Sequence, residues 1–189
     1  LGEIQIQKET KAVFQVGSQR VSSLAFKKAK ELYQAGAIGK LNSIQASFNR
    51  QSALGAWQYT IPLDASPSTV DWDRFQATEQ KKYAYDSNRF FRWRNYREYG
   101  TGVAGDLFVH LLSGIHFITD SKGPDKIFSV ADLAYWKDGR NVPDVMTAVI
   151  HYPETKEHPS FQVSLQVNFI SCEGEVGYTQ MIGSEGVID

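Results

Sequence analysis

The sequence has little cysteine and no long hydrophobic run, and each shortage excludes a class of protein. Among its 189 residues only Cys172 is a cysteine, so an internal disulfide and a zinc site built from cysteines are both excluded. Cys172 follows an apolar run, and we expect it to be a small buried residue. No run of about 18 apolar residues occurs, so the sequence contains no candidate transmembrane helix.

The sequence also lacks an excess of charge of either sign. It has 20 Lys and Arg against 21 Asp and Glu, for a net charge of −1. Proteins that bind nucleic acid usually carry a basic excess, so we rank nucleic acid last among the possible partners. Hydrophobic residues make up 42% and aromatic residues 13%, enough to form a sizeable core, and a folded domain is expected.

The N-terminal residues lack the features of a signal peptide. Residues 1–11 mix charged and amide side chains without an apolar centre, and on that basis we expect a cytoplasmic protein. The sequence begins with Leu1 and stops at Asp189 in the middle of a pattern. We therefore expect a piece of a longer protein, which leaves a periplasmic location open.

Hydrophobic periodicity predicts an α+β fold. A helix is expected over residues 23–35, where Ser23 can act as N-cap and Gly36 can end the helix, and a second helix is expected over residues 103–119. Residues 51–79 read as a long functional loop. The expected strands are residues 12–16, 40–50, 127–136, 145–152, 161–169, 178–182 and 186–189. Because the later strands are joined by short turns, we expect an open, mostly antiparallel mixed sheet with helices packed on one face.

Gly100 to Gly105 match the pattern G-x-G-x-x-G just before the second predicted helix. A dinucleotide-binding loop of this pattern must follow an apolar parallel strand, whereas residues 89–99 are charged and aromatic. Asp120 lies at the helix end, where it cannot serve as the acidic residue at the end of the next strand. We therefore interpret these glycines as a turn into the helix.

Asp106 and His110 are the residues on which we expect the chemistry to depend. Their spacing of four places both side chains on one face of the second predicted helix. A carboxylate beside an imidazole fixes its tautomer and raises its basicity, which suits proton transfer near neutral pH. An ordinary surface pair has the same spacing, but a position just after a glycine-rich segment favours a site. His116 points away from His110, so no metal site is predicted.

Residues 89–97 interleave four arginines with four aromatic residues. In a small-molecule site, the rings would face a sugar and the guanidinium groups would bind hydroxyl or phosphate oxygens. A nucleic-acid site would use the same groups as stacking platforms and phosphate clamps. A purely structural segment would pair its arginines with nearby acids. We rank the small-molecule site first and the structural segment second.

These features together resemble the Gfo/Idh/MocA family of glucose-fructose oxidoreductases, inositol dehydrogenases and related enzymes. The second domain of that family typically has a G-x-G segment followed by Asp and His four residues apart, which is the order of Gly100, Gly102, Asp106 and His110. The resemblance covers the chain from about Val13 to its end. Further matches in the family's order are residues 14–20, 36–40, 70–73 and 93–94.

The resemblance implies two domain parts. Residues 1–19 would be the remnant of a dinucleotide-binding domain, and residues 20–189 would be the C-terminal substrate-binding and oligomerisation domain, with a fold like that of dihydrodipicolinate reductase. The family's nucleotide-binding domain and its Glu-Lys-Pro motif are absent from these 189 residues. We therefore expect the chain alone to be inactive.

The resemblance also implies an activity, namely NAD- or NADP-dependent oxidation of a sugar, polyol or cyclitol hydroxyl by hydride transfer. His110 would be the general base and Asp106 its partner, and the cofactor would be bound mainly by the other domain. Two alternatives stay open: an NAD-dependent glycosidase of the same family and a non-catalytic binding or assembly domain. The residues expected to contact substrate or cofactor are Arg20, Arg92, Trp93 and Arg94.

The resemblance further implies a homodimer or tetramer that packs through the open face of the sheet. Residues 161–169 alternate without a fault, and their polar members form one row. That row, Gln162, Ser164, Gln166 and Asn168, would be either a subunit interface or a solvated face.

Overall fold

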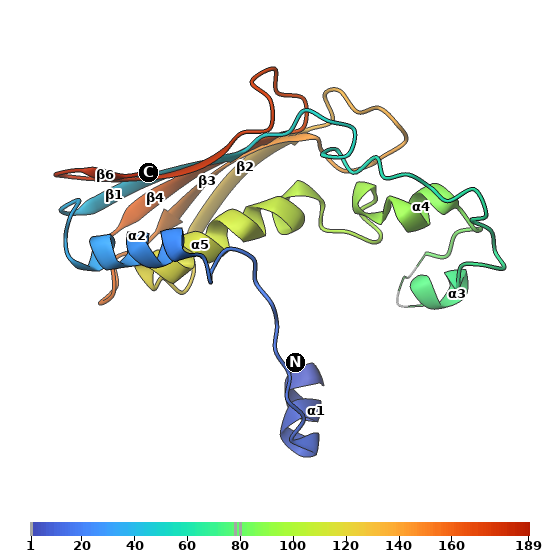
Figure 1. Cartoon of the computed structure of the whole chain (residues 1–189), viewed down its shortest axis with the longest axis horizontal. Coiled ribbons are helices and arrows are strands. Elements are labelled where there is room, and N and C mark those ends of the chain that lie inside the picture. Colours follow the sequence, from blue (N-terminus) through green and yellow to red (C-terminus); the bar gives the residue numbers. More distant parts are fainter. Residues whose placement is uncertain (1, 78, 80) are drawn as a thin grey trace.

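The computed structural model describes residues 2–77, 79 and 81–189, which form one six-stranded sheet with helices on one face (Figure 1). The strand order is β2-β3-β4-β1-β5-β6. Of the pairings between these strands, β1 with β4 is parallel and the others are antiparallel. The predicted open, mostly antiparallel mixed sheet is therefore confirmed. The strands are β1 Leu41–Phe48, β2 Lys126–Asp132, β3 Val145–Tyr152, β4 Phe161–Asn168, β5 Gly177–Gly183 and β6 Val187–Ile188.

The two longer helices that pack on the sheet are α2 (Leu24–Gln34) and α5 (Val109–Thr119), and Figure 1 shows them side by side on the same face. In α2, the Ser23 hydroxyl accepts a hydrogen bond from the backbone N–H of Ala25 at 3.2 Å, as the predicted N-cap requires. In α5, the buried side chains are those that face the sheet, among them Leu111, Ile115 and Ile118. The core lies between this helix pair and the sheet.

The central strand β4 shows why the two faces of the sheet differ. Phe161, Val163, Leu165 and Val167 are at most 1% exposed and line the core, whereas the polar residues between them lie on the other face. Side chains alternate between the two faces of a strand, so the regular sequence alternation fixes the orientation of β4. The predicted polar row is therefore on the face without helices.

The predicted strand over residues 12–16 is wrong. A first helix, α1 (Gly2–Thr10), precedes this segment and projects from the body of the domain (Figure 1). Residues 11–18 have no regular structure, and Val13, Phe14 and Val16 are 100, 59 and 77% exposed. An apolar run forms a strand only when a neighbouring strand accepts its hydrogen bonds and covers its side chains.

Two further expectations need correction. The predicted strand over residues 127–136 ends at Asp132 because the buried carboxylate of Asp144 accepts hydrogen bonds from the backbone N–H groups of residues 134–136, at 2.6 to 2.8 Å. These N–H groups are thereby unavailable to a neighbouring strand. Cys172 was expected to be buried but is exposed, since it lies in the turn after β4, beyond the last core position.

The long segment over residues 51–79 is held by its aromatic residues, and residue 78 of it lies outside the described residues. Trp57 is 1% exposed and meets Phe169 edge to face, with ring centroids 4.8 Å apart. Trp72 opens the short helix α3 (Trp72–Phe75) and stacks on Phe75 at 5.5 Å. The segment continues toward α4 (Ser87–Phe91) and the 3₁₀ turn η1 (Trp93–Asn95).

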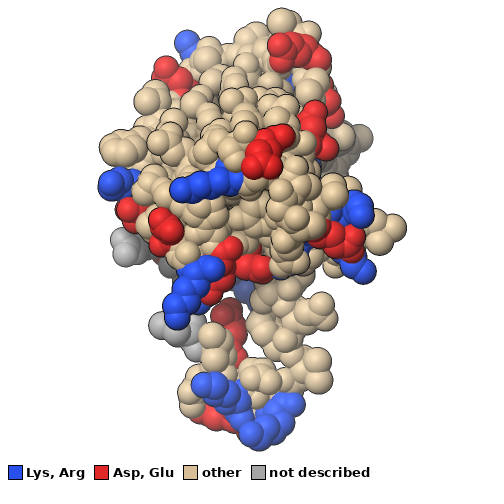
Figure 2. Space-filling model, turned by 90° about the vertical axis from the view of Figure 1, so that its left-hand side faces the viewer, with Lys and Arg blue, Asp and Glu red and all other residues tan. Residues whose placement is uncertain are grey.

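The surface carries mixed charge. On the side that Figure 2 shows, acidic and basic side chains are interspersed, in keeping with a net charge of −1. Within the described part of the chain, every helix is too short or too polar to cross a membrane.

Candidate active site

The second predicted helix begins with an unusual turn that contains Asp106. Residues Ala104–Phe108 form a π-helical turn (η2), and α5 continues directly from it. Single π turns inside helices are frequent at functional sites. His110 lies on the first turn of α5. The predicted helix is therefore confirmed, but its first turn is wider than an ordinary α-helix.

The glycines before and within this turn serve packing. Gly102 has φ +61°, which favours glycine, and a Cβ at Gly105 would collide with the side chain of Thr101. At Gly100 a Cβ would meet the Cα of Arg94 at 3.2 Å. Helical turns, not an apolar strand, precede the segment, so our interpretation of these glycines as a turn into the helix is confirmed.

Asp106 is paired with Arg94. The Nε of Arg94 donates to Oδ1 of Asp106 at 3.0 Å, and the guanidinium group lies 4.3 Å from the ring centroid of Trp93. Both charged side chains are about one-third exposed. The sequence predicted His110 as the hydrogen-bonding partner of Asp106, and the 3₁₀ turn η1 places Arg94 there instead. Trp93, Arg94 and Asp106 thus form a connected row beside α5.

The imidazole ring of His110 is the candidate proton acceptor. It is half-buried, and among the described residues no side chain hydrogen-bonds to its ring. Burial lowers the pKa of His110, and the positive charge of Arg20 lowers that pKa further; Asp106 opposes this shift, while Arg50 adds to it. The imidazole is therefore neutral at pH 7 and can accept a proton.

The structure brings Arg20 and Arg50 to His110 from distant parts of the sequence. Both guanidinium groups lie against the ring of Phe48, with Cζ 4.8 and 5.0 Å from its centroid. Arg20 was a predicted site residue, but Arg50 was missed. Its position as the last residue of the strand predicted over residues 40–50 was the available signal. Without knowledge of the strand order, nothing in the sequence places the end of β1 next to α5.

The side chain of Arg92 is hydrogen-bonded to the long loop. Its Nε donates to the carbonyl oxygen of Tyr59 at 2.9 Å, which ties the loop to the segment before η1. Its part in ligand binding stays a prediction. Arg94, by contrast, is paired with Asp106, and its guanidinium group lies over the ring of Trp93.

The other histidines have partners that the sequence did not reveal. His116 Nε2 and the Tyr152 hydroxyl are hydrogen-bonded at 2.7 Å in the core. His151, on the face of the sheet without helices, is bonded through Nδ1 to Asp125 at 2.5 Å and through Nε2 to Ser160 at 3.1 Å. Within the described residues, His, Cys, Asp and Glu form no group of three or more that could hold a metal ion.

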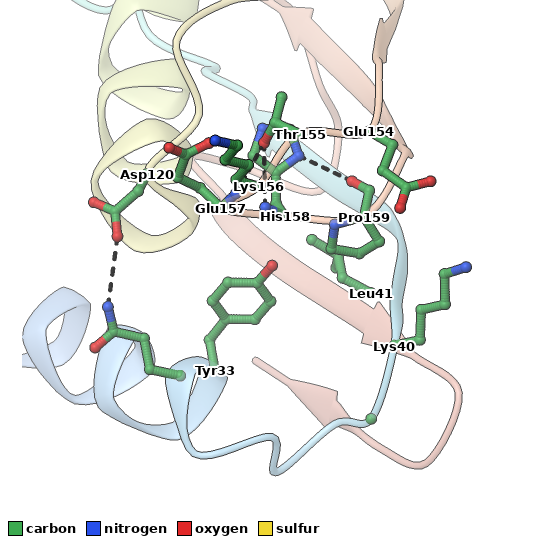
Figure 3. Close-up of a pocket in the computed structure, with 12 residues that line it drawn as sticks. Tyr33, Lys40, Leu41, Asp120, Glu154, Thr155, Lys156, Glu157, His158 and Pro159 are labelled. Atoms are coloured by element: carbon green, nitrogen blue, oxygen red, sulfur yellow. Dashed lines mark hydrogen bonds between the residues drawn. The ribbon is translucent and has the colours of Figure 1, made fainter.

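A hollow of about 500 Å³ lies at the opposite end of α5 (Figure 3). Asp120, which follows α5, borders it ten residues beyond His110, roughly 15 Å along the helix axis at 1.5 Å per residue. Two of the ionisable side chains that line it, Asp120 and His158, have hydrogen-bond partners within the chain. Asp120 accepts from Lys30 at 2.5 Å and from Gln34 at 3.5 Å, and His158 Nδ1 bonds to the Pro159 carbonyl at 2.9 Å. We therefore place the candidate site at Asp106 and His110, not in this hollow.

Comparison with solved structures identifies the fold. The WlbA dehydrogenase from Bordetella pertussis, in complex with NADH and UDP-GlcNAcA, matches 97% of this chain with a TM-score of 0.64 and 11% identity. An NAD-binding protein from Listeria innocua matches 98% with a TM-score of 0.59 and 19% identity. GenD2 from gentamicin A biosynthesis, in complex with NAD, matches 95% with a TM-score of 0.61 and 16% identity. No family model and no curated protein matches the chain.

The match covers one part of these proteins. The chain spans 40 to 44% of their length. At identities of 11 to 19% the likeness establishes the fold. The resemblance to the C-terminal domain of Gfo/Idh/MocA oxidoreductases is thus confirmed at the level of the fold.

Proposed function

We propose that residues 20–189 are the substrate-binding domain of an NAD- or NADP-dependent oxidoreductase that oxidises a hydroxyl of a sugar, polyol or cyclitol. Residues 1–19 would then be the end of its nucleotide-binding domain. The observation that carries the proposal is His110, a half-buried imidazole that no described side chain hydrogen-bonds and whose pKa is lowered by burial and by Arg20, in a domain with the fold of known dehydrogenases. A general base for alcohol oxidation needs that protonation state and that freedom.

In this proposal each residue of the site has a task. A ring nitrogen of His110 accepts the proton of the substrate hydroxyl, and the negative charge of Asp106 favours the imidazolium that forms. Arg94 is held by Asp106 and by the face of Trp93, so its other nitrogens are fixed in position for substrate oxygens. Arg20 and Arg92 complete the predicted set.

A nicotinamide cofactor would supply the hydride acceptor. The described strands form a mixed sheet with one parallel pair, which is not the parallel sheet that binds a dinucleotide. The donor set of this chain suits the nicotinamide end alone, with the Trp93 ring as a face and Arg94 as a donor. The rest of the cofactor would be held by protein outside these 189 residues.

The test uses the full-length protein with NAD or NADP and a panel of polyols, hexoses and cyclitols. We expect reduced cofactor to form with at least one of them, and His110→Ala to lower kcat/KM about 100-fold or more. The 189-residue chain should form none. Release of phenol from aryl glycosides without net NADH would favour the glycosidase. Activity that His110→Ala leaves unchanged would contradict a catalytic role for this site.

We also propose that the full-length protein is a homodimer or tetramer that packs through the face of the sheet opposite the helices. Three large apolar side chains on that face, Phe128, Val130 and Val149, are 71, 77 and 44% exposed and adjoin across β2 and β3. Exposed apolar side chains that cluster in this way are typical of interfaces. Phe128→Asp should shift the mass measured by light scattering toward the monomer, whereas Tyr135→Asp, outside the strands, should not.

A further inference from the structure

Arg20 and Arg50 form an unusual pair beside the candidate base. Their guanidinium groups lie against the same ring, that of Phe48, so the two positive charges stand within about 10 Å of each other, close to one Debye length at 0.1 M salt. Among the described residues, no carboxylate lies within 4.0 Å of either group. The nearby carboxylate of Asp106 is already bonded to Arg94. In the described part of the chain neither charge is therefore paired with a carboxylate, and Nη1 of Arg50 donates to the carbonyl oxygen of Gly55 at 3.4 Å.

The backbone at Arg20 is held in a conformation that arginine rarely adopts. Its φ is +75°, a region that costs a residue with a Cβ on the order of 1 kcal/mol or more. The turn that imposes it is closed by the backbone N–H of Ser23, which donates to the carbonyl of Arg20 at 2.8 Å. This turn leads directly into α2. The guanidinium group thus comes from a short, fixed connection instead of a free loop.

Arg20 also borders open space. It lines a cavity of about 330 Å³ between α2 and β5, whose walls include the apolar side chains of Phe26 and Met181 and the carboxylate residue Asp189. Its side chain is half-buried, so part of its water shell is already lost. A half-buried guanidinium group next to open space is well suited to bind an anion, because its planar N–H groups match the two oxygens of a carboxylate or phosphate.

We propose that Arg20 and Arg50 bind an oxyanion carried by the substrate, a carboxylate or a phosphate, and that the enzyme therefore prefers anionic sugars to neutral ones. That the oxyanion belongs to the substrate rests on the proposed function, in which a substrate hydroxyl meets His110. Both arginines lie close enough to His110 to act on its charge. In this proposal one sugar would place a hydroxyl at His110 and its anionic group at the arginine pair.

The experiment compares three sugars that differ in charge. Binding of D-glucose, D-glucuronate and D-glucose 6-phosphate to the full-length protein is measured by calorimetry. We expect one or both anionic sugars to bind at least tenfold more tightly than glucose, and Arg20→Gln and Arg50→Gln each to weaken that binding about ten- to hundredfold, as loss of a charged hydrogen bond does. Arg74→Gln, on the exposed surface of α3, is the matched control and should change nothing.

The outcomes separate this inference from the proposed function. Glucose binding as tightly as both anionic sugars, or no measurable binding of either anion, would overturn the anion site. So would a loss of NADH affinity without a loss of sugar affinity in the two variants, because the arginines would then bind the cofactor. Anion binding that depends on both arginines, without any cofactor-linked turnover, would leave the site intact and refute the oxidoreductase. Whether the carboxylate or the phosphate sugar binds more tightly identifies the anion.

Discussion

Helix α5 carries two histidines, six residues apart, in opposite chemical situations. His110 lies near its start, half-buried, with an imidazole that no described side chain hydrogen-bonds. His116 lies about 1.7 turns later at 3.6 residues per turn, where Nε2 is bonded to the hydroxyl of Tyr152. Burial lowers the pKa of both. The difference lies in the neighbours, which are arginines and a carboxylate at His110 but aromatic rings at His116.

The comparison shows that the hydrogen-bond partners of a histidine, and not its spacing in the sequence, distinguish a structural histidine from one available for catalysis. Around His116 the core is closed, because Tyr152 is fully buried and stacks on Phe161 with ring centroids 4.7 Å apart. The hydroxyl of Tyr152 would be buried without a partner if His116 were absent. At His110 nothing in the described part of the chain would lose a hydrogen bond. His116 therefore has a structural partner, whereas the ring of His110 has none among the described side chains.

The strongest test of this contrast removes each ring in turn and measures stability. His116→Ala should lower the free energy of unfolding by about 1 to 3 kcal/mol, because it leaves the buried Tyr152 hydroxyl unpaired. His110→Ala should change it by no more than about 0.5 kcal/mol, as exposed or unpartnered positions do. Urea denaturation of the chain followed by circular dichroism measures both. Equal losses of unfolding free energy in the two variants would contradict the view that His116 is structural and His110 is not.

The pH dependence of that loss provides an independent check. The pKa of His116 is lowered by burial and by the charge of His158, so the unfolded chain takes up a proton on His116 before the folded chain does. Stability from this group is full above the ordinary value of 6.5 and is lost as the pH falls below it. His116→Ala removes that loss. The gap between wild type and variant should therefore narrow as the pH falls from 7.5 to 5.5.

Local patterns predicted most of the fold. The alternation in β4 and the periodicity and N-cap of α2 are properties of neighbouring residues, and both were recovered to within a residue or two. The strand predicted over residues 12–16 was wrong, because an apolar pattern does not show whether a partner strand exists. The strand predicted over residues 127–136 was too long, because the carboxylate of Asp144, twelve residues beyond the end of β2, binds the backbone N–H groups that would continue the strand.

The site was predicted less completely, for a related reason. Asp106 and His110 are close in sequence, so spacing and resemblance could place them together. Arg50 joins them only because β1 is paired with β4 and ends near α5, and strand order is not readable from a single sequence. The pairing of Asp106 with Arg94 depends on a π turn and a 3₁₀ turn, for which the residues give no periodic signal.

A smaller effect, a shift in the pKa of His110, tests the role of its charged neighbours. The acidic limb of the dependence of kcat/KM on pH reports the pKa of His110 in the free enzyme. Arg20 lowers that pKa, so Arg20→Gln should move the limb to higher pH, because the imidazole then protonates more readily. Asp106 raises the same pKa, so Asp106→Asn should move the limb to lower pH. The measurement is kcat/KM of the full-length protein between pH 5 and 8.

The opposite signs make this test specific, whatever activity each variant retains. Either substitution could lower the rate by disturbing the structure, but a structural disturbance does not move a limb up in one variant and down in the other. His116→Gln is the control on the same helix. It should leave the limb where it is, because Nε2 of His116 is bonded to Tyr152 within the core. If the acidic limb moved in His116→Gln and stayed in place in Arg20→Gln and Asp106→Asn, the assignment of His110 as the general base would be refuted.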